Sequence, residues 1–372
     1  MKTLLPGVVH KLGTAIKDLA KNRSSSWWYT PHMAAAAHAI AERIPLVDLV
    51  LEVRDARIPL SSKFKLLKKC SSSTSQVIVL NKTDFASRSQ VKEWMDHFEE
   101  QDNVVFGVNS HNRDSIKEFL NFLQSRVREL TDSGHHQHTI TLMLVGIPNV
   151  GKSALANGLH QIGRISAAEK GRLKHATVSP HPGETRDISS LKIASHPSIY
   201  VLDTPGILPP HIPDADVCCK LALTGAIRNC LVGEVELAQY LLGIVNTSDE
   251  FKKWAKLVAI EKETVIAAAN NGCFDSKKTQ RTRQYLTDHT QDFIVNNVRK
   301  TLFDAIASFN GDLGDEESLL QLIKVEFANL GEAFYLPSES RADLHKISAK
   351  ILNLYRTGRL GHYPLDLVPN KQ

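Results

Sequence analysis

Short apolar runs alternate with amphipathic stretches from Ile44 to about Gly206. Five of these runs have the length and the β-branched content of strands, and they read "VDLVLEV", "QVIVLN", "VVFGVNS", "ITLMLVG" and "SIYVLDTPG". The stretches between them, such as "SRSQVKEWMDHFEEQ", suit helices. Strands that are apolar throughout and alternate with helices predict an α/β fold around a mostly parallel sheet that is buried on both faces.

The pattern changes after Pro213, where the strand signals stop. Segments such as "EVELAQYLLGIV" and "EESLLQLIKVEFANL" carry apolar residues at spacings of three and four, which is typical of amphipathic helices. Three prolines interrupt the chain between Leu208 and Pro213, and a chain of 372 residues exceeds what one hydrophobic core usually serves. We therefore expect an α/β domain over residues 26–210 and an all-helical domain over residues 211–372.

The first 25 residues differ from the rest because they carry five basic side chains against a single acid, Asp18. Their leucine, valine and isoleucine residues recur at near-helical spacing. This make-up predicts a mitochondrial targeting segment over residues 1–25, with an ordinary surface helix as the alternative.

Composition adds only broad limits. An apolar content of 42% with 23% charged residues is ordinary for a soluble globular protein. No apolar run approaches the roughly 18 to 20 residues that a membrane span needs, so we expect none. The five cysteines show no spacing suited to a zinc site or a disulfide framework, which favours a reducing compartment. The net charge is only +5, so any affinity for nucleic acid has to come from local basic clusters.

The segment "GIPNVGKS", Gly146 to Ser153, has the form of a phosphate-binding loop. It follows the strand "ITLMLV" and precedes the helix-compatible "ALANGLHQI", which is the context that such a loop requires. Backbone N–H groups would surround the β-phosphate, Lys152 would neutralise the phosphate oxygens, and the Ser153 hydroxyl would bind Mg²⁺. The residues expected at the nucleotide here are Asn149, Val150, Gly151, Lys152, Ser153 and Ala154.

The segment "DTPG", Asp203 to Gly206, ends another predicted strand about fifty residues later. Asp203 would hold Mg²⁺ through water, and the Gly206 N–H would meet the γ-phosphate, so this loop would sense a triphosphate. Thr185, in the intervening "HPGETRD", is the candidate for a second Mg²⁺ ligand, ahead of Ser179 and Thr177.

The segment "NKTD", Asn81 to Asp84, selects guanine. The carboxylate of Asp84 can accept hydrogen bonds from guanine N1–H and from its exocyclic amino group, an arrangement that adenine does not offer. The residues expected to form this pocket are Asn81, Lys82, Thr83 and Asp84, supported by Asn109 and Ser110 after the strand "VVFGVNS". The substrate is therefore expected to be GTP, which disfavours a kinase or an ATPase.

The order of these parts is unusual, because the guanine half precedes the phosphate half. A domain whose ends lie close together can be cut and rejoined elsewhere without a change in its sheet. The sequence therefore predicts a circularly permuted Ras-like P-loop GTPase domain. In this order the "DTPG" loop is the last part of that domain and leads directly into the helical domain.

Three further motifs place the chain near a known family. They are "VRDARIP" at Val53 to Pro59, "LDTPGIL", and "LALTGAI" at Leu221 to Ile227. With the permuted order, they make the chain resemble the YlqF/RbgA family of circularly permuted GTPases, and its mitochondrial DAR GTPase members most closely, from about Trp27 to Asp366. The resemblance implies a GTPase of late assembly of the large ribosomal subunit, here the mitochondrial one. It implies hydrolysis that the ribosomal particle stimulates, in a matrix protein that we expect to be a monomer.

The resemblance also implies roles at the reacting phosphate. Ile207 stands where many GTPases place a water-orienting glutamine. The family motif Trp-x-x-x-His-Met matches Trp28 and His32-Met33, which makes His32 the catalytic candidate, together with Thr185 and Asp203. From the residues alone a structural role beside a helix is favoured for His32, so both roles stay open. Asn149 occupies the family's position for a potassium ligand.

Basic residues gather in three places outside the predicted nucleotide site, which makes contacts with rRNA phosphates the favoured hypothesis. These residues are Lys63, Lys65, Lys68 and Lys69; Lys277, Lys278, Arg281 and Arg283; and His345, Lys346, Lys350, Arg356 and Arg359 with Tyr355. Two alternatives remain open at this stage: a nucleotide-stabilised rRNA-binding module with negligible turnover, and a ribosome-assembly GTPase outside mitochondria.

Overall fold

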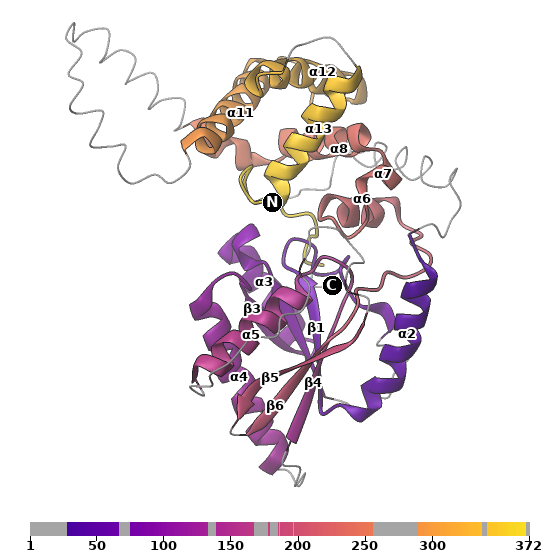
Figure 1. The fold of residues 1–372 in the computed structure, drawn as a ribbon. Coiled ribbons are helices and arrows are strands. Elements are labelled where there is room, and N and C mark those ends of the chain that lie inside the picture. Colours follow the sequence, from indigo (N-terminus) through magenta and orange to yellow (C-terminus); the bar gives the residue numbers. More distant parts are fainter. Residues whose placement is uncertain are drawn as a thin grey trace, which may run out of the picture. The chain divides into compact units, whose positions relative to one another are not determined.

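The computed structural model describes residues 28–66, 75–132, 139–166, 178, 185, 187–195, 197–255, 289–336 and 341–369 (Figure 1). The predicted targeting segment lies outside these residues. The described chain forms two compact units, an α/β unit of residues 28–232 and 364–369 and a helical unit within residues 233–363. The α/β unit continues past residue 210, and the expected domain bounds of 26–210 and 211–372 stay a prediction.

The described strands form one six-stranded sheet in the order β3-β2-β1-β4-β6-β5. The strands are β1 (Leu49–Asp55), β2 (Ser75–Asn81), β3 (Val104–Val108), β4 (Thr139–Val145), β5 (Ser189–Ser195) and β6 (Ser198–Asp203). All neighbours are parallel except β5, which pairs antiparallel with β6 at the edge of the sheet. The predicted α/β fold with a mostly parallel sheet is confirmed, and β5 is the strand that the sequence pattern missed.

Helices cover both faces of this sheet (Figure 1). They are α2 (Pro31–Arg43), α3 (Arg88–Glu99), α4 (Arg113–Asp132) and α5 (Lys152–Ser166), with the short turns η1 (Ile44–Leu46) and η3 (Thr83–Phe85). On one face α2 packs over Val50 and Met143, which pair across β1 and β4. Farther along the same face, Trp94 of α3 packs against Ile78 and Leu80.

The opposite face is covered by α4 and α5. Phe119 of α4 lies against Phe106 of β3, with ring centroids 5.0 Å apart. The two helices approach closely at Gly158 of α5, where an added Cβ would lie 3.1 Å from the Ile116 side chain of α4. The sheet is thus buried on both faces, as the continuous apolar strands predicted.

Local sequence explains where the helices of this unit begin. Thr30 caps α2 by accepting the Met33 N–H, and Pro31 occupies the first turn, where its missing N–H costs nothing. Ser87 and Gln90 form a reciprocal capping box at the start of α3. These caps fix the loops that precede both helices.

The joint between the two halves of the sheet lies between β1 and β4, which pair from Leu49 with Leu142 to Glu52 with Val145. The guanine half supplies β1, β2 and β3, whereas the phosphate half supplies β4, β5 and β6. Because the carboxyl ends of parallel strands meet at the same edge, the loops after β1, β2, β3, β4 and β6 gather at one end of the sheet. The strand order thereby confirms the circular permutation.

Two further helices complete the α/β unit, namely α6 (Ala215–Leu223) and α7 (Asn229–Val232). The end of the chain belongs to this unit as well. The buried carboxylate of Asp366 accepts hydrogen bonds from Leu60 N at 2.9 Å and Ser61 N at 2.8 Å. It also pairs with the Lys220 ammonium of α6 at 3.2 Å.

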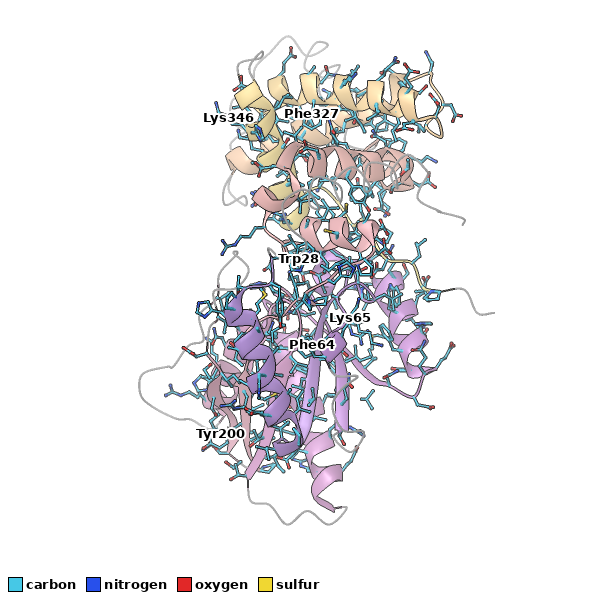
Figure 2. The ribbon with its side chains drawn as sticks, turned by 90° about the vertical axis from the view of Figure 1, so that its right-hand side faces the viewer. Trp28, Phe64, Lys65, Tyr200, Phe327 and Lys346 are labelled. Carbon is cyan, nitrogen blue, oxygen red and sulfur yellow. The ribbon has the colours of Figure 1, made fainter. Side chains whose placement is uncertain are left out.

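The helical unit contains α8 (Glu234–Thr247), η4 (Asp249–Trp254), α11 (His289–Ser308), α12 (Glu316–Ala333) and α13 (Arg341–Arg356). Phe327 of α12 is buried in this unit, whereas Lys346 of α13 is exposed (Figure 2). The predicted helical character of this part is confirmed. Within the described ranges, no helix combines the length and the apolar content required to cross a membrane.

Candidate nucleotide site

The predicted phosphate loop connects β4 to α5 at the carboxyl end of the sheet. Three of its residues, Gly146, Asn149 and Gly151, have positive φ angles of 154°, 59° and 94°. At Gly146 a Cβ would lie 2.5 Å from the Val53 carbonyl oxygen, so this position tolerates only glycine. The loop is folded tightly against the end of β1, as the motif requires.

Lys152 begins α5 and is buried within the phosphate loop. Its ammonium donates to the carbonyl oxygens of Gly146 at 3.1 Å and Ile147 at 2.9 Å. Burial lowers the pKa of Lys152 to about 8, and the nearby Asp203 carboxylate opposes that shift. Burial of the charged ammonium costs desolvation free energy, and the negative charge of a bound phosphate group would offset that cost.

Ser153, Thr185 and Asp203 come together beside this lysine. The Ser153 hydroxyl donates to Asp203 Oδ2 at 2.7 Å and lies 3.2 Å from the Thr185 hydroxyl. Asp203 is fully buried, and its other carboxylate oxygen, Oδ1, has no hydrogen-bond partner among the residues that the structure describes. Burial raises the pKa of Asp203, whereas the Ser153 hydroxyl and the Lys152 ammonium lower it. A buried carboxylate next to two hydroxyl groups is the kind of oxygen donor set that fits Mg²⁺.

The guanine loop contacts the phosphate loop directly. The Asn81 side-chain amide donates to the Val150 carbonyl at 2.8 Å, and its oxygen accepts the Ser110 hydroxyl at 2.7 Å. The Lys82 ammonium donates to the Asn149 carbonyl at 2.5 Å. Residues separated by almost seventy positions in the sequence thus meet across β1, and the two predicted half-sites form one site.

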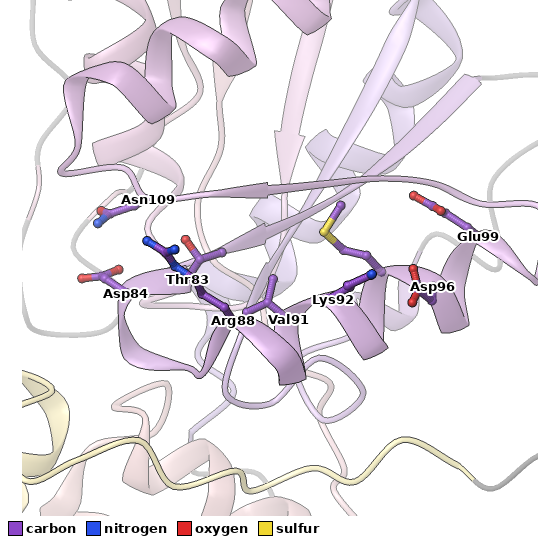
Figure 3. Close-up of a pocket in the computed structure, with 9 residues that line it drawn as sticks. Thr83, Asp84, Arg88, Val91, Lys92, Asp96, Glu99 and Asn109 are labelled. Atoms are coloured by element: carbon purple, nitrogen blue, oxygen red, sulfur yellow. The ribbon is translucent and has the colours of Figure 1, made fainter.

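Asp84 and Asn109 lie at one end of a cavity of about 520 Å³ that continues along α3 (Figure 3). Thr83 also lines this cavity, and Asp96 and Glu99 lie at its far end. No residue of the described phosphate loop lines this cavity. The cavity therefore overlaps the predicted base site only at Thr83, Asp84 and Asn109, and the rest of it lies along α3.

The "DTPG" loop is attached to the phosphate half of the sheet. The Thr204 hydroxyl donates to the Leu144 carbonyl at 2.6 Å, and Ile207 N donates to the Gly146 carbonyl at 3.3 Å. A Cβ at Gly206 would lie 2.5 Å from Pro148 Cα, so Gly206 touches the phosphate loop. The Ile207 side chain is buried beneath α2, where no water-orienting role is open to it.

His32 is exposed in the first turn of α2. The start of this helix is tied to the segment that follows the "DTPG" loop, because Trp28 Nε1 donates to the Pro209 carbonyl at 3.0 Å (Figure 2). The hydrogen bonds among the described residues include none between His32 and the phosphate-binding residues. The structure therefore brings Ser153, Thr185 and Asp203 together, but it does not join His32 to them.

Asn149 has a side-chain contact that the sequence did not predict. Its Nδ2 donates to the Thr224 carbonyl at 3.1 Å, within the segment "LALTGAI". The segment "LALTGAI" was noticed in the sequence only as a motif that resembles a known family, and the motif gave no indication of a contact with Asn149. Asp55 was missed in the same way: it lies within the DAR motif and pairs with Lys82 at 3.1 Å. The remaining candidates for the second Mg²⁺ ligand, Ser179 and Thr177, lie outside the described residues.

Comparison with known proteins yields related sequences over almost the whole chain. A family model described as a 50S ribosome-binding GTPase matches residues 141–271. The chain is 55% identical to "DAR GTPase 2, mitochondrial" of Arabidopsis thaliana, over 97% of this chain and 95% of that protein. It is 39% identical to "Short integuments 2, mitochondrial" of the same plant, over 100% of this chain and 95% of the relative. Identity to "Ribosome biogenesis GTPase A" of Bacillus pumilus is 30%, over 74% and 95%.

Proposed function

The chain belongs to the family of DAR GTPases and ribosome biogenesis GTPases, and from this membership we propose that it hydrolyses GTP during assembly of the mitochondrial large ribosomal subunit. The observation that carries the proposal is the joined site, in which Asn81 and Lys82 of the guanine loop contact the phosphate loop. The resemblance predicted from the DAR motif and the permuted order is confirmed by the relatives.

GTP binding follows from the residues of this site. The backbone N–H groups of the phosphate loop and the N-terminus of α5 surround the β-phosphate, and Lys152 supplies a positive charge. Asp84 accepts the two guanine donors, while the Asn81 amide holds the loop that follows β3 through Ser110. Gly206 lies close enough to the phosphate loop for its N–H to meet the γ-phosphate.

Ser153, Thr185 and Asp203 would hold Mg²⁺, consistent with the buried and unpartnered Asp203 Oδ1. The bound ion would neutralise negative charge that develops on the phosphate oxygens. Burial raises the pKa of Asp203, and the neighbouring Ser153 hydroxyl and Lys152 ammonium oppose that rise without cancelling it.

Orientation of the attacking water needs a group other than Ile207, which is buried. We propose His32 for that role, and we propose that it takes up its active position when the particle binds. The proposal is supported by Trp28, which ties the start of the helix that carries His32 to the segment after the "DTPG" loop. For Asn149 we propose potassium coordination through Oδ1. Its amide nitrogen is engaged with Thr224, which leaves the carbonyl oxygen, a type of ligand that potassium accepts.

The partner is proposed from the relatives and from exposed cations. Relatives in plants are named mitochondrial, which supports mitochondrial localisation, and we place the protein in the matrix, as a monomer, with the ribosomal subunit. The exposed basic side chains proposed to meet rRNA phosphates are Lys63, Lys65, His345, Lys346 and Lys350. Tyr355, which accompanies this cluster in the sequence, is buried in the helical unit and cannot stack on a base.

The test is a multiple-turnover phosphate-release assay with purified mitochondrial large subunits, small subunits or no particle. Stimulation by the large subunit, with competition by GDP and not by ATP, is the expected result. Potassium should accelerate the reaction over sodium if Asn149 holds the cation. The buried Ile207 favours one rival function, a nucleotide-stabilised rRNA-binding module. Nucleotide-dependent binding to the subunit without turnover would support that rival.

A further inference from the structure

The DAR turn, defined here as Asp55 to Arg57, follows β1 and contains a buried ion pair. Arg57 Nε donates to Asp55 Oδ1 at 2.9 Å, and one of its terminal nitrogens donates to Oδ2 at 2.7 Å. The Arg57 backbone N–H also donates to Oδ1 at 3.0 Å. A bidentate arginine contact with a further backbone donor fixes the carboxylate of Asp55 in one orientation.

This carboxylate also faces the guanine loop. Asp55 Oδ2 lies 3.1 Å from the Lys82 ammonium, which in turn donates to the Asn149 carbonyl at 2.5 Å. Asp55 thus stands behind the lysine that bridges from the guanine loop to the phosphate loop. The two cations hold the pKa of Asp55 well below its usual range although burial acts to raise it, so the group is ionised.

Two more contacts join the DAR turn to the same loop. The Ala56 N–H donates to the Asn81 carbonyl at 2.9 Å. The Arg57 guanidinium lies over the Phe85 ring, 5.2 Å from its centroid. Since Asp84 lies between Lys82 and Phe85 in the sequence, the DAR turn supports the guanine-reading residue from both sides.

Lys82 needs such support for two reasons. Its φ of 61° lies in the left-handed region, which a residue with a side chain adopts only at a cost. Its side chain is only 17% exposed, and burial lowers its pKa while Asp55 raises it. A buried ammonium on a flexible stem needs a counter-charge if it is to remain charged and in one rotamer.

We propose that Asp55 is a positioning residue for nucleotide binding: held by Arg57, it fixes the Lys82 ammonium against the phosphate loop before the nucleotide arrives. This inference rests on the proposed function, because it concerns the same GTP site. A lysine that is already held in place costs less entropy to order when the nucleotide binds. Replacement of Asp55 should therefore lower the affinity for the nucleotide. Asp55 reaches the nucleotide only through Lys82, and hydrolysis of bound GTP should depend on it little.

The experiment measures GDP affinity by calorimetry in a double-mutant cycle of Asp55→Asn and Lys82→Met. We expect Asp55→Asn alone to weaken GDP binding about tenfold, and to weaken it less than about twofold when Lys82 is already replaced. The single-turnover rate at saturating GTP should stay within about twofold of the wild-type rate. An equal loss of affinity in both backgrounds, or a loss confined to the turnover rate, would overturn the role of Asp55.

The chain provides a matched control in Glu52, two residues earlier on β1. Its buried carboxylate forms the same bidentate pair with Arg54, at 2.9 and 2.7 Å, but among the described residues its other hydrogen bonds come from Phe64 N and the Gln76 amide, not from the guanine loop. Glu52→Gln should lower the unfolding midpoint and leave GDP affinity unchanged. If it weakened GDP binding as much as Asp55→Asn does, the effect would be general destabilisation and the proposal would be wrong.

Asp55→Asn leaves two buried cations with one neutral partner, so a charge-balanced variant completes the design. Asp55→Asn with Arg57→Gln removes one charge of each sign and should also bind GDP about tenfold more weakly. A folded double variant with wild-type affinity would overturn the proposal. The wild-type protein distinguishes failure of the proposed function from failure of this inference. If the wild type did not bind GDP, the proposed function would be overturned. If the wild type and the Asp55→Asn variant bound GDP equally well, only the inference about Asp55 would be overturned.

Discussion

The Asp84 side chain is the group on which base selection depends in the proposed site. It belongs to η3, which begins directly after Lys82, the residue that turns the chain with its left-handed backbone. Asp84→Asn replaces one acceptor oxygen with a donor, which faces the exocyclic amino group of guanine unfavourably. We expect GTP affinity to fall by about 1–3 kcal/mol and xanthosine triphosphate, which has a carbonyl at that position, to bind better than GTP. Competition binding measures the change in preference.

Asp96 is the matched control for this substitution, because it lines the far end of the same cavity (Figure 3). Asp96→Asn removes the same charge from α3 and should leave the preference for guanine intact. A guanine preference that survives Asp84→Asn would show that another group reads the base.

At the residue scale, the sequence predicted roles that depend on a local motif. Lys152, Ser153 and Asn81 could be assigned because each lies at a fixed position beside a strand end, where the backbone determines what the side chain reaches. Asp55 could not, because its partner Lys82 lies in the loop after another strand, β2, and the spacing between the two residues carries no periodic signal. The left-handed conformation of Asn149 was equally hidden, since asparagine is compatible with several loop geometries.

Among the elements, strand prediction succeeded for the five strands that pair in parallel, the edge strand β3 included. β1 is buried along its whole length, and its apolar residues Leu49 to Leu51 and Val53 make the strand recognisable although Glu52 interrupts the run. β5, Ser189–Ser195, is an antiparallel edge strand with a register shift between Lys192 and Ala194, and its short mixture of polar and apolar residues gave no clear period. The permuted order was predictable because it needs only the positions of the motifs along the chain.

Helix α12 contains a buried carboxylate, Glu326, that makes the helical unit sensitive to pH. Its Oε2 accepts the Asn246 side-chain amide at 3.0 Å, while within the described part of the chain its Oε1 and the Asn246 Oδ1 have no hydrogen-bond partner. Burial raises the pKa of Glu326 from 4.5 to about 8. Its contribution to stability is complete below about pH 4.5. It is lost as the pH rises to about 8, because the unfolded chain gives up its proton first.

Glu326→Gln should remove this pH dependence, because an amide does not ionise and can donate to the unpartnered Asn246 Oδ1. We expect the unfolding midpoint of the variant to exceed that of the wild type by at least about 4 °C at pH 8, with the advantage shrinking toward pH 5. Thermal unfolding followed by circular dichroism across this range provides the measurement. Glu332→Gln, at an exposed position of the same helix, should change little at any pH. A constant difference between wild type and Glu326→Gln at all pH values would contradict ionisation as the cause.

At the scale of the whole molecule, the helical unit is inserted in the sequence between two parts of the α/β unit. The second part is short, residues 364–369 as described, and Asp366 anchors it. The carboxylate satisfies two backbone N–H groups and the Ser61 hydroxyl, and it pairs with Lys220. Burial acts to lower the pKa of Lys220, but Asp366 and Asp216 raise it overall, so the lysine remains charged.

Asp366→Ala should destabilise the α/β unit by about 3 kcal/mol, because it leaves buried donors and part of a buried charge without a partner. Urea unfolding of the nucleotide-free protein measures the loss. Asp249→Ala is the control: the side chains of Asp249 and of its partner Lys252 are 64% and 67% exposed, and pairs of that kind contribute little. Equal losses for the two variants would show that the chain end does not hold the unit together.

Binding of the particle would involve both units, since the nucleotide site lies in the α/β unit and the exposed basic residues His345, Lys346 and Lys350 lie on α13 of the helical unit. A γ-phosphate can favour particle binding only if the bound state contacts it differently from the free state. We expect the protein with a non-hydrolysable GTP analogue to co-sediment with the mitochondrial large subunit, and the GDP form to bind at least about tenfold more weakly. Lys346→Glu with Lys350→Glu should abolish co-sedimentation and leave GTP affinity normal, because the cations that would meet rRNA phosphates are lost.

Lys324→Glu, an exposed change of the same sign on α12, shifts the net charge half as far as the double variant and should retain most of the binding. Wild-type binding should also weaken steeply as salt rises, since each released counterion adds to the salt dependence. Equal sedimentation of the analogue and GDP forms would show that the nucleotide does not gate the particle. If Lys324→Glu lost binding as fully as the double variant, the attraction would arise from overall charge and the cluster on α13 would have no special role.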